Sequence, residues 1–248
     1  PVVFDVVAGT GPYNEQLILD SIRGASAVNT VTFNGNGNAI RYAPIVNDER
    51  AVIKLRRTDH IRFNNLEIDA TVPGSSYGYG VQLINNADSN IFNNCSILTR
   101  IDTNATTYAG VVINASDINA ITTGNTLCDG NLFSGNLISG GYYGVTLVGS
   151  TTVANRSNTF INNTVRDNNS YGFYILGSYD VRIEANDISR PNRVSPAAFY
   201  GIYFTGLSVA SNVTRNRIHN PYDQVGTSVG AAYGIYFTGC DGFTGLEN

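Results

Sequence analysis

The chain has 248 residues, enough for one large domain or two small ones. Charged residues make up only 14% of it, against about 25% in an average soluble protein. Frequent asparagine and glycine provide much of the remaining polar and turn-forming character. The 14 arginines and single lysine form no basic stripe, so nucleic acid is not an expected partner. No apolar run approaches the roughly 20 residues of a spanning helix, so membrane insertion is not expected either.

Metal and cofactor motifs are not visible. The three cysteines, Cys95, Cys128 and Cys240, lack zinc-ligand spacing, and no calcium-binding loop occurs. We therefore expect no cofactor and no metal site. Cys95 lies in an apolar stretch and is expected to be a buried thiol, whereas the sequence leaves open whether any two cysteines pair.

Residues 1–50 differ from the rest of the chain. They contain Thr10-Gly-Pro-Tyr-Asn-Glu-Gln-Leu and Asn29-Thr-Val-Thr-Phe-Asn-Gly-Asn-Gly, and they are predicted to form an N-terminal capping or first-coil region. The chain starts at Pro1, and it stops at Asn248 shortly after the start of another repeat. We expect it to be a piece of a longer parent chain with adjoining domains, truncated at the C-terminal end of its repeats.

Residues 51–248 contain an internal repeat, whose main block is an aromatic or small residue, a glycine and alternating apolar residues. Its copies start at Tyr79, Ala109, Tyr143, Tyr171, Tyr200 and Tyr233. The glycines of these copies stand at positions 80, 110, 144, 172, 201 and 234, so the block returns at a nearly constant spacing. A second element, an asparagine followed one residue later by an apolar residue, recurs at Asn136, Asn163, Asn186 and Asn216, and a third apolar pair precedes most copies.

Three short alternating stretches in each period of about 30 residues predict three β-strands per turn. Stacked turns place each strand beside its equivalent about 4.8 Å away, which gives an all-β solenoid of three parallel sheets with about six to seven coils. Alternation predicts inward columns formed by Val81/Leu83, Val111/Ile113, Val145/Leu147, Phe173/Ile175, Ile202/Phe204 and Ile235/Phe237. The recurring asparagines are expected to form a ladder at one corner, because the amide can bond both the turn backbone and the next asparagine.

The glycine-apolar and asparagine-apolar elements at this spacing resemble the right-handed parallel β-helix repeats of the pectate-lyase-like superfamily. The opening segments resemble large secreted surface proteins of Bacteroidetes-type bacteria. The resemblance implies fold more than function, because that superfamily includes lyases, hydrolases, epimerases, tailspikes and adhesins. It also implies a secreted or cell-surface bacterial location.

Two charged groups are candidates for a catalytic centre. The first is the dense segment of Lys54, Arg56, Arg57, Asp59, His60 and Arg62, for which a solvated surface is the simpler interpretation. The second arises by stacking: Asp187 and Arg217 occupy one outward position on successive coils, with Arg166, Ser189 and His219 in the next column. A cross-strand ion pair explains that group without catalysis. We therefore assign no catalytic residue.

An aromatic column is the clearest candidate site. The outward positions of the main block are Lys54, Gln82, Val112, Thr146, Tyr174, Tyr203 and Tyr236. Tyr174, Tyr203 and Tyr236, flanked by the glycines and by Thr205 and Thr238, could form a flat strip that stacks on sugar rings. A stabilising aromatic ladder is the alternative. The column starting at Tyr79, Tyr143, Tyr171, Tyr200 and Tyr233 has inward parity and is interpreted as structural.

The sequence thus favours a non-catalytic segment of a secreted or cell-surface bacterial protein, used for adhesion or glycan binding. The expected partner is a polysaccharide or cell-surface glycan. The alternative is a carbohydrate-active enzyme of the β-helix superfamily, a polysaccharide lyase or glycoside hydrolase.

Overall fold

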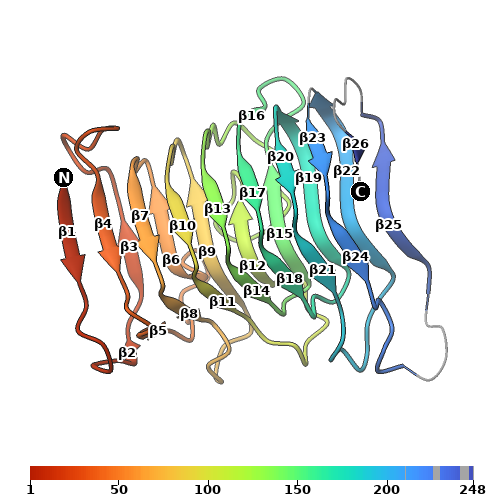
Figure 1. Ribbon diagram of the computed structural model, residues 1–248, viewed down its shortest axis with the longest axis horizontal. Helices are drawn as coiled ribbons and strands as arrows, with labels where there is room; N and C mark the ends of the chain where they lie inside the picture. Colours follow the sequence, from red (N-terminus) through yellow and green to blue (C-terminus); the bar gives the residue numbers. More distant parts are fainter. Residues whose placement is uncertain (210, 226–229, 241–245, 248) are drawn as a thin grey trace.

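The computed structural model describes residues 1–209, 211–225, 230–240 and 246–247. The chain winds as a right-handed parallel β-helix, with its N-terminus at one end of the long axis and its last strands at the other (Figure 1). Every pair of neighbouring strands is parallel, and each strand pairs with its equivalent in the next coil. No α-helix occurs in the described part of the chain, and so it contains no helix that could cross a membrane.

Sheet A consists of β1 (Val2–Asp5), β4 (Val31–Asn34), β7 (Ile61–Asn64), β10 (Ile91–Asn93), β13 (Leu132–Ser134), β17 (Thr159–Ile161), β20 (Arg182–Glu184), β23 (Asn212–Thr214) and β26 (Leu246–Glu247). Sheet B consists of β2 (Tyr13–Asn14), β5 (Ala39–Arg41), β8 (Glu67–Asp69), β11 (Ser96–Leu98), β14 (Leu137–Ser139), β18 (Thr164–Arg166), β21 (Asp187–Ser189) and β24 (Arg217–His219). Sheet C consists of β3 (Leu17–Leu19), β6 (Ala51–Arg56), β9 (Gly78–Ile84), β12 (Tyr108–Ile113), β15 (Tyr143–Val148), β19 (Tyr171–Tyr179), β22 (Phe199–Val209) and β25 (Ala232–Thr238), with the short β16 (Asn155–Arg156) paired to β19.

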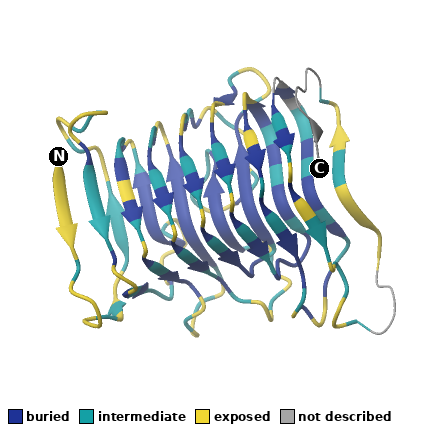
Figure 2. Ribbon diagram, in the orientation of Figure 1, coloured by how far each residue is buried: buried dark blue, intermediate teal, exposed yellow. Residues whose placement is uncertain are grey.

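The predicted solenoid is confirmed, including its number of coils after residue 50. Along sheet C every strand except β3 follows that residue, which gives seven coils from β6 to β25. The strands β1 to β5, which precede it, pair in register with the strands that follow them. The sheet C strands β9, β12 and β15 of the central coils are buried along their whole length, whereas β1 and much of β25 are exposed (Figure 2).

The core is a set of stacked columns, as alternation predicts. On sheet C the predicted inward pairs from Val81 to Phe204 are fully buried, while Ile235 is partly buried and Phe237 lies exposed on the last coil. On sheet A the inward position is a phenylalanine in six successive coils, whose rings stack with centroids 4.9–5.2 Å apart; these are Phe4, Phe33, Phe63, Phe92, Phe133 and Phe160. Offset stacking of this kind stabilises neighbouring coils beyond the burial of apolar area.

The asparagine ladder is confirmed. The side-chain amides of Asn136, Asn163, Asn186 and Asn216 form a continuous chain, each Nδ2 donating to the next Oδ1 at 2.9–3.0 Å. Each Oδ1 also accepts a backbone N–H from the preceding coil, as Asn163 does from Asn136 at 3.0 Å and Asn136 does from Cys95 at 2.8 Å. The residue before each ladder asparagine has a positive φ, so the ladder holds a left-handed corner in place.

Candidate functional site

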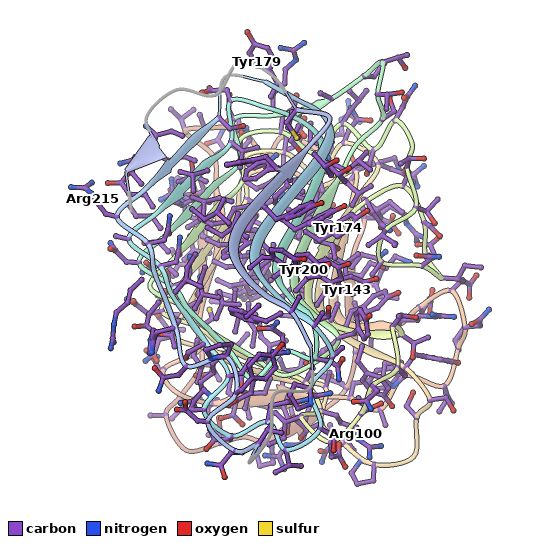
Figure 3. All side chains as sticks on the ribbon, turned by 90° about the vertical axis from the view of Figure 1, so that its right-hand side faces the viewer. Arg100, Tyr143, Tyr174, Tyr179, Tyr200 and Arg215 are labelled. Carbon is purple, nitrogen blue, oxygen red and sulfur yellow. The ribbon has the colours of Figure 1, made fainter. Side chains whose placement is uncertain are left out.

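The outer face of sheet C carries two columns of tyrosine on its last coils. We call this surface the tyrosine face and define it as Tyr143, Tyr171, Tyr174, Tyr200, Tyr203, Tyr233 and Tyr236. Cross-strand register places the column from Tyr174 to Tyr236 and the column from Tyr143 to Tyr233 on successive strands. Viewed along the axis, Tyr143, Tyr174 and Tyr200 lie on the outer side of the sheet (Figure 3).

The assignment of the column from Tyr79 to Tyr233 to the interior was wrong. Tyr79 and Tyr143 belong to an apolar cluster outside the sheet, together with the outward Val112 and the loop residue Ala120. Simple alternation fails in β15, β19, β22 and β25 because the pairing skips the glycine after the tyrosine, so the tyrosine two residues before an inward position faces outward. A Cβ on Gly172 would point inward and lie 2.8 Å from Cγ2 of the buried Ile188.

The flanking glycines Gly172 and Gly201, expected to face outward, therefore face the core. Gly201 has the same surroundings, since its Cβ would lie 2.6 Å from Cγ2 of Ile218 and 2.6 Å from the carbonyl oxygen of Gly234. The carbonyl oxygen of the next coil fills the space where a side chain would begin, which explains why the position is glycine. Because the pairing skips the glycine, the tyrosines at its two sides end up on one surface.

The tyrosine rings pack in a herringbone pattern. Within a column they are nearly parallel: Tyr203 lies 5.2 Å from Tyr174 and 5.4 Å from Tyr236, with interplanar angles of 23° and 6°. Between columns they meet edge to face, as Tyr200 does with Tyr203 at 5.3 Å and 81°. Both arrangements are the favoured geometries of aromatic pairs.

This packing changes how the face could contact a ligand. Nearly parallel rings with centroids 5.2–5.4 Å apart are offset stacks, so each face of Tyr203 is partly covered by Tyr174 or Tyr236. The rings are therefore not the coplanar strip that the sequence suggested. They are partly exposed, and what they can offer a ligand is mainly ring edges and hydroxyl groups.

The hydroxyl groups of the exposed and partly exposed tyrosines of this face have no partner among the described residues. These tyrosines are Tyr171, Tyr174, Tyr200, Tyr203, Tyr233 and Tyr236. Burial, with a smaller contribution from neighbouring tyrosines, raises the pKa of Tyr171 to about 12. Burial likewise raises the pKa of Tyr174 and Tyr200. Each hydroxyl can therefore both donate and accept a hydrogen bond.

Thr205 and Thr238 occupy the positions expected of them. They pair in register with each other and with Leu176, two residues beyond the tyrosine of each coil, and so form a third outward column beside Tyr174, Tyr203 and Tyr236. Thr205 is partly exposed and Thr238 is exposed.

The other end of the predicted aromatic column is covered. Lys54, Gln82, Val112 and Thr146 do lie in register with Tyr174, but all four are completely buried. The loop 114–124, which we call the flap, lies over them. It is held by Lys54 Nζ, 2.6 Å from Asp117 Oδ1, and by Gln82 Nε2, which donates to the Ser116 carbonyl at 2.9 Å.

The dense charged segment near residue 54 does not converge on a site. Lys54 turns under the flap, while Arg56 forms two hydrogen bonds to Asp20 at 2.7 and 3.0 Å.

Asp59 starts a column of carboxylates at a corner of the solenoid. Asp59 Oδ1 accepts the backbone N–H of Asp88, whose Oδ1 accepts that of Asp129. Burial, aided by these two like charges, raises the pKa of Asp88 to about 6.

The charged group on sheet B does converge. Oδ2 of Asp187 lies 3.1 Å from Arg217 Nη1, and Oδ1 of the same carboxylate lies 2.9 Å from His219 Nε2. Arg166 and Ser189 lie in register with His219, as the sequence suggested. One carboxylate shared by two cationic or polar partners is an ordinary cross-strand interaction, and it is also a possible acid–base group.

Comparison with known proteins gives a family-level similarity. The profile of a family described as "Periplasmic copper-binding protein (NosD)" matches residues 127–248. No curated protein sequence matches the chain.

Solved structures show the fold. The chain is similar to pectate lyase Pel9A, with a TM-score of 0.54 and 12% identity, covering 87% of this chain and 52% of the lyase. It is also similar to the Dettilon tailspike protein, with a TM-score of 0.59 and 13% identity, covering 95% of this chain and 39% of the tailspike. The chain thus spans about half or less of the length of either protein. Its fold is that of pectate-lyase-like proteins.

The residues present do not fit copper. Copper is held by imidazole, thiolate and thioether groups, and the chain has no methionine. Burial raises the pKa of Cys128 to about 12, so this thiol stays protonated. The part of the chain that the structure describes has no group of three or more His, Cys, Asp and Glu side chains placed to hold a metal ion.

Proposed function

We propose that the chain is a non-catalytic, glycan-binding segment of a secreted or cell-surface bacterial protein, used in adhesion. Its partner is a polysaccharide or cell-surface glycan, and the contacts are made by Tyr174, Tyr203 and Tyr236 with Thr205 and Thr238. The observation that carries the proposal is the tyrosine face. Partly exposed tyrosines with free hydroxyls repeat there on successive coils, an aromatic and polar combination suited to sugars.

The proposed cellular location and the proposed longer parent chain are supported by different comparisons. The family whose profile matches residues 127–248 is described as periplasmic, which supports a site outside the cytoplasm. The chain covers about half of pectate lyase Pel9A and less of the tailspike, so we propose that it works beside adjoining domains of a longer parent chain. We also propose that it binds no nucleic acid and inserts into no membrane.

Replacing Tyr203 with alanine tests the proposal, because this ring has parallel neighbours on both sides. The variant should lose most binding on a broad glycan array, while the free energy of unfolding falls by about 2 kcal/mol through lost ring contacts. Tyr179→Ala is the matched control: that ring is 40% exposed, lies off the face against Arg156, and should leave binding unchanged. If Tyr203→Ala binds every glycan as the wild type does, the tyrosines only stabilise a structural shaft.

A second candidate function is a polysaccharide lyase or glycoside hydrolase. The observation in its favour is the contact of Asp187 with both Arg217 and His219 on the outer face of sheet B. Such an enzyme would release new reducing ends from a polysaccharide, and Asp187→Asn would abolish the release without changing binding at the tyrosine face. If the wild type releases none from any polysaccharide that it binds, this alternative fails.

A further inference from the structure

The charges of the last coils are distributed unevenly over the three outer faces. Sheet A and its edge carry Arg182, Glu184 and Arg215, and sheet B carries Arg166, Asp187, Arg217 and His219. On the same coils, the tyrosine face and the column beside it on sheet C contain no charged residue; the members of these three columns are Tyr171, Tyr174, Leu176, Tyr200, Tyr203, Thr205, Tyr233, Tyr236 and Thr238. The nearest charge on this sheet is Arg156 of β16, which lies beyond these columns against the ring of Tyr179. An uncharged face has no cation to compensate a bound carboxylate or sulfate.

The same face presents its hydrogen-bonding groups in a regular order. Each coil adds the same pair of tyrosines, and parallel rings in neighbouring coils lie 4.8–5.4 Å apart. A chain that lies along the solenoid axis meets the same groups again at every coil. A chain that crosses the axis meets only the three columns of one coil.

We infer that the tyrosine face binds an uncharged polysaccharide that lies along the solenoid axis and is held by the tyrosine hydroxyls rather than by stacking on ring faces. This inference rests on the proposed function. The rings of Tyr171, Tyr200 and Tyr203 each have a stacked neighbour on both sides. The tyrosine hydroxyls, which have no partner among the described residues, are therefore the main polar contacts of the face, beside the hydroxyls of Thr205 and Thr238. Binding energy accumulates over successive coils, as in other multivalent contacts.

The first test is a wild-type binding profile on an array that carries neutral glucans, mannans, xylans and galactans beside acidic pectins and alginates. Retained glycans should be neutral, and raising the NaCl concentration from 50 to 500 mM should change their affinity less than twofold, because screening acts on charges. Affinity should rise with oligosaccharide length until the exposed coils are spanned. If acidic glycans are retained in place of neutral ones, the inference is overturned while the proposed function stands. If no glycan is retained, both fail.

The second test removes three hydroxyls and keeps the rings, in the triple variant Tyr174→Phe/Tyr203→Phe/Tyr236→Phe. We expect at least a tenfold loss of affinity for the retained neutral glycan, with the midpoint of urea unfolding unchanged because the herringbone packing remains. Tyr179→Phe is the matched control, since this exposed tyrosine lies off the face, against Arg156. Unchanged affinity of the triple variant would show that the hydroxyls are not the contacts.

Discussion

Single side chains fix the corners of this solenoid. The asparagine ladder was predictable because the same residue recurs in register at Asn136, Asn163, Asn186 and Asn216. A second ladder at another corner was missed: Asn90 Nδ2 donates to Asn131 Oδ1, and Asn131 Nδ2 to Asn158 Oδ1, both at 3.1 Å. Each of its members stands two residues before an inward phenylalanine of sheet A, so the same pattern of asparagine and apolar residue was present in the sequence and was overlooked; the phenylalanines are Phe92, Phe133 and Phe160.

Asp88 is a residue whose charge works against the fold. Its pKa of about 6 lies above the ordinary value of 3.8, so the folded chain binds this proton more tightly than the unfolded chain does. The resulting stability is fully present below pH 3.8 and is lost as the pH rises through 6. We expect Asp88→Asn to raise the free energy of unfolding at pH 7.5 by on the order of 2 kcal/mol, a figure reduced for solvent screening of this half-buried group and measured by urea denaturation.

The asparagine oxygen can still accept the backbone N–H of Asp129, which isolates the effect of charge. The gain should shrink toward pH 4, where the wild-type carboxyl is itself protonated when folded. Asp180→Asn, at an exposed aspartate, serves as the control and should change stability little at either pH. If the gain in unfolding free energy from Asp88→Asn does not depend on pH, the charge of Asp88 is not the cause of the destabilisation.

The strands of sheet C show where alternation is a reliable guide and where it is not. It placed Val81, Phe173 and Ile202 correctly in the core, and it placed Tyr174 correctly outside. It misplaced Tyr171 because counting by twos assumes a regular strand, and the pairing of this strand skips Gly172. The glycine in every copy was the available signal, since a recurring glycine inside a strand pattern often marks a bend or a close approach of backbone.

The role of this glycine can be tested with two glycines at the same position of the repeat. A methyl group on Gly172 would collide with the Gly201 carbonyl and with Ile188, so Gly172→Ala should lower the free energy of unfolding by about 3 kcal/mol. At Gly234 no atom of the described residues lies within 4 Å of the added carbon. Gly234→Ala should therefore cost less than about 1 kcal/mol, by the same urea titration. Equal costs would show that the close approach of the next coil does not select glycine at this position.

At the scale of the molecule, the near-constant period of the repeat was sufficient to predict the fold. The candidate site was only partly predictable. Register alone gave the outward column from Lys54 to Tyr236, but the flap hides its first four members, and loop packing leaves no periodic signal in the sequence. The contact of Asp187, Arg217 and His219 was foreseen because it depends on register and not on a loop.

Thiol labelling reports on whether the stack opens as a whole. Cys95 and Cys128 are buried, and burial raises their pKa to about 11 and about 12, whereas Cys240 is partly exposed. A maleimide at pH 7.5 should label one thiol rapidly in the native protein and all three in 6 M guanidinium chloride. Cys240→Ser should then take up no rapid label. Rapid labelling of two or more thiols in the native wild type would indicate that the central coils open easily.

The repeated register of the tyrosine face also bears on how such a protein changes in length. One whole coil runs from Gly172 to Gly201, and β19 and β22 at its two ends present the same tyrosine pair. Their inward residues are apolar in both strands, with Phe173 opposite Ile202 and Ile175 opposite Phe204. Duplication of the gene segment for this coil would insert a unit that already matches both of its neighbours, adding a row to the tyrosine face without disturbing the rest. Deletion would shorten the face by one row. Unequal recombination between such segments therefore offers a simple evolutionary route to adjust the number of sugar units that the molecule spans.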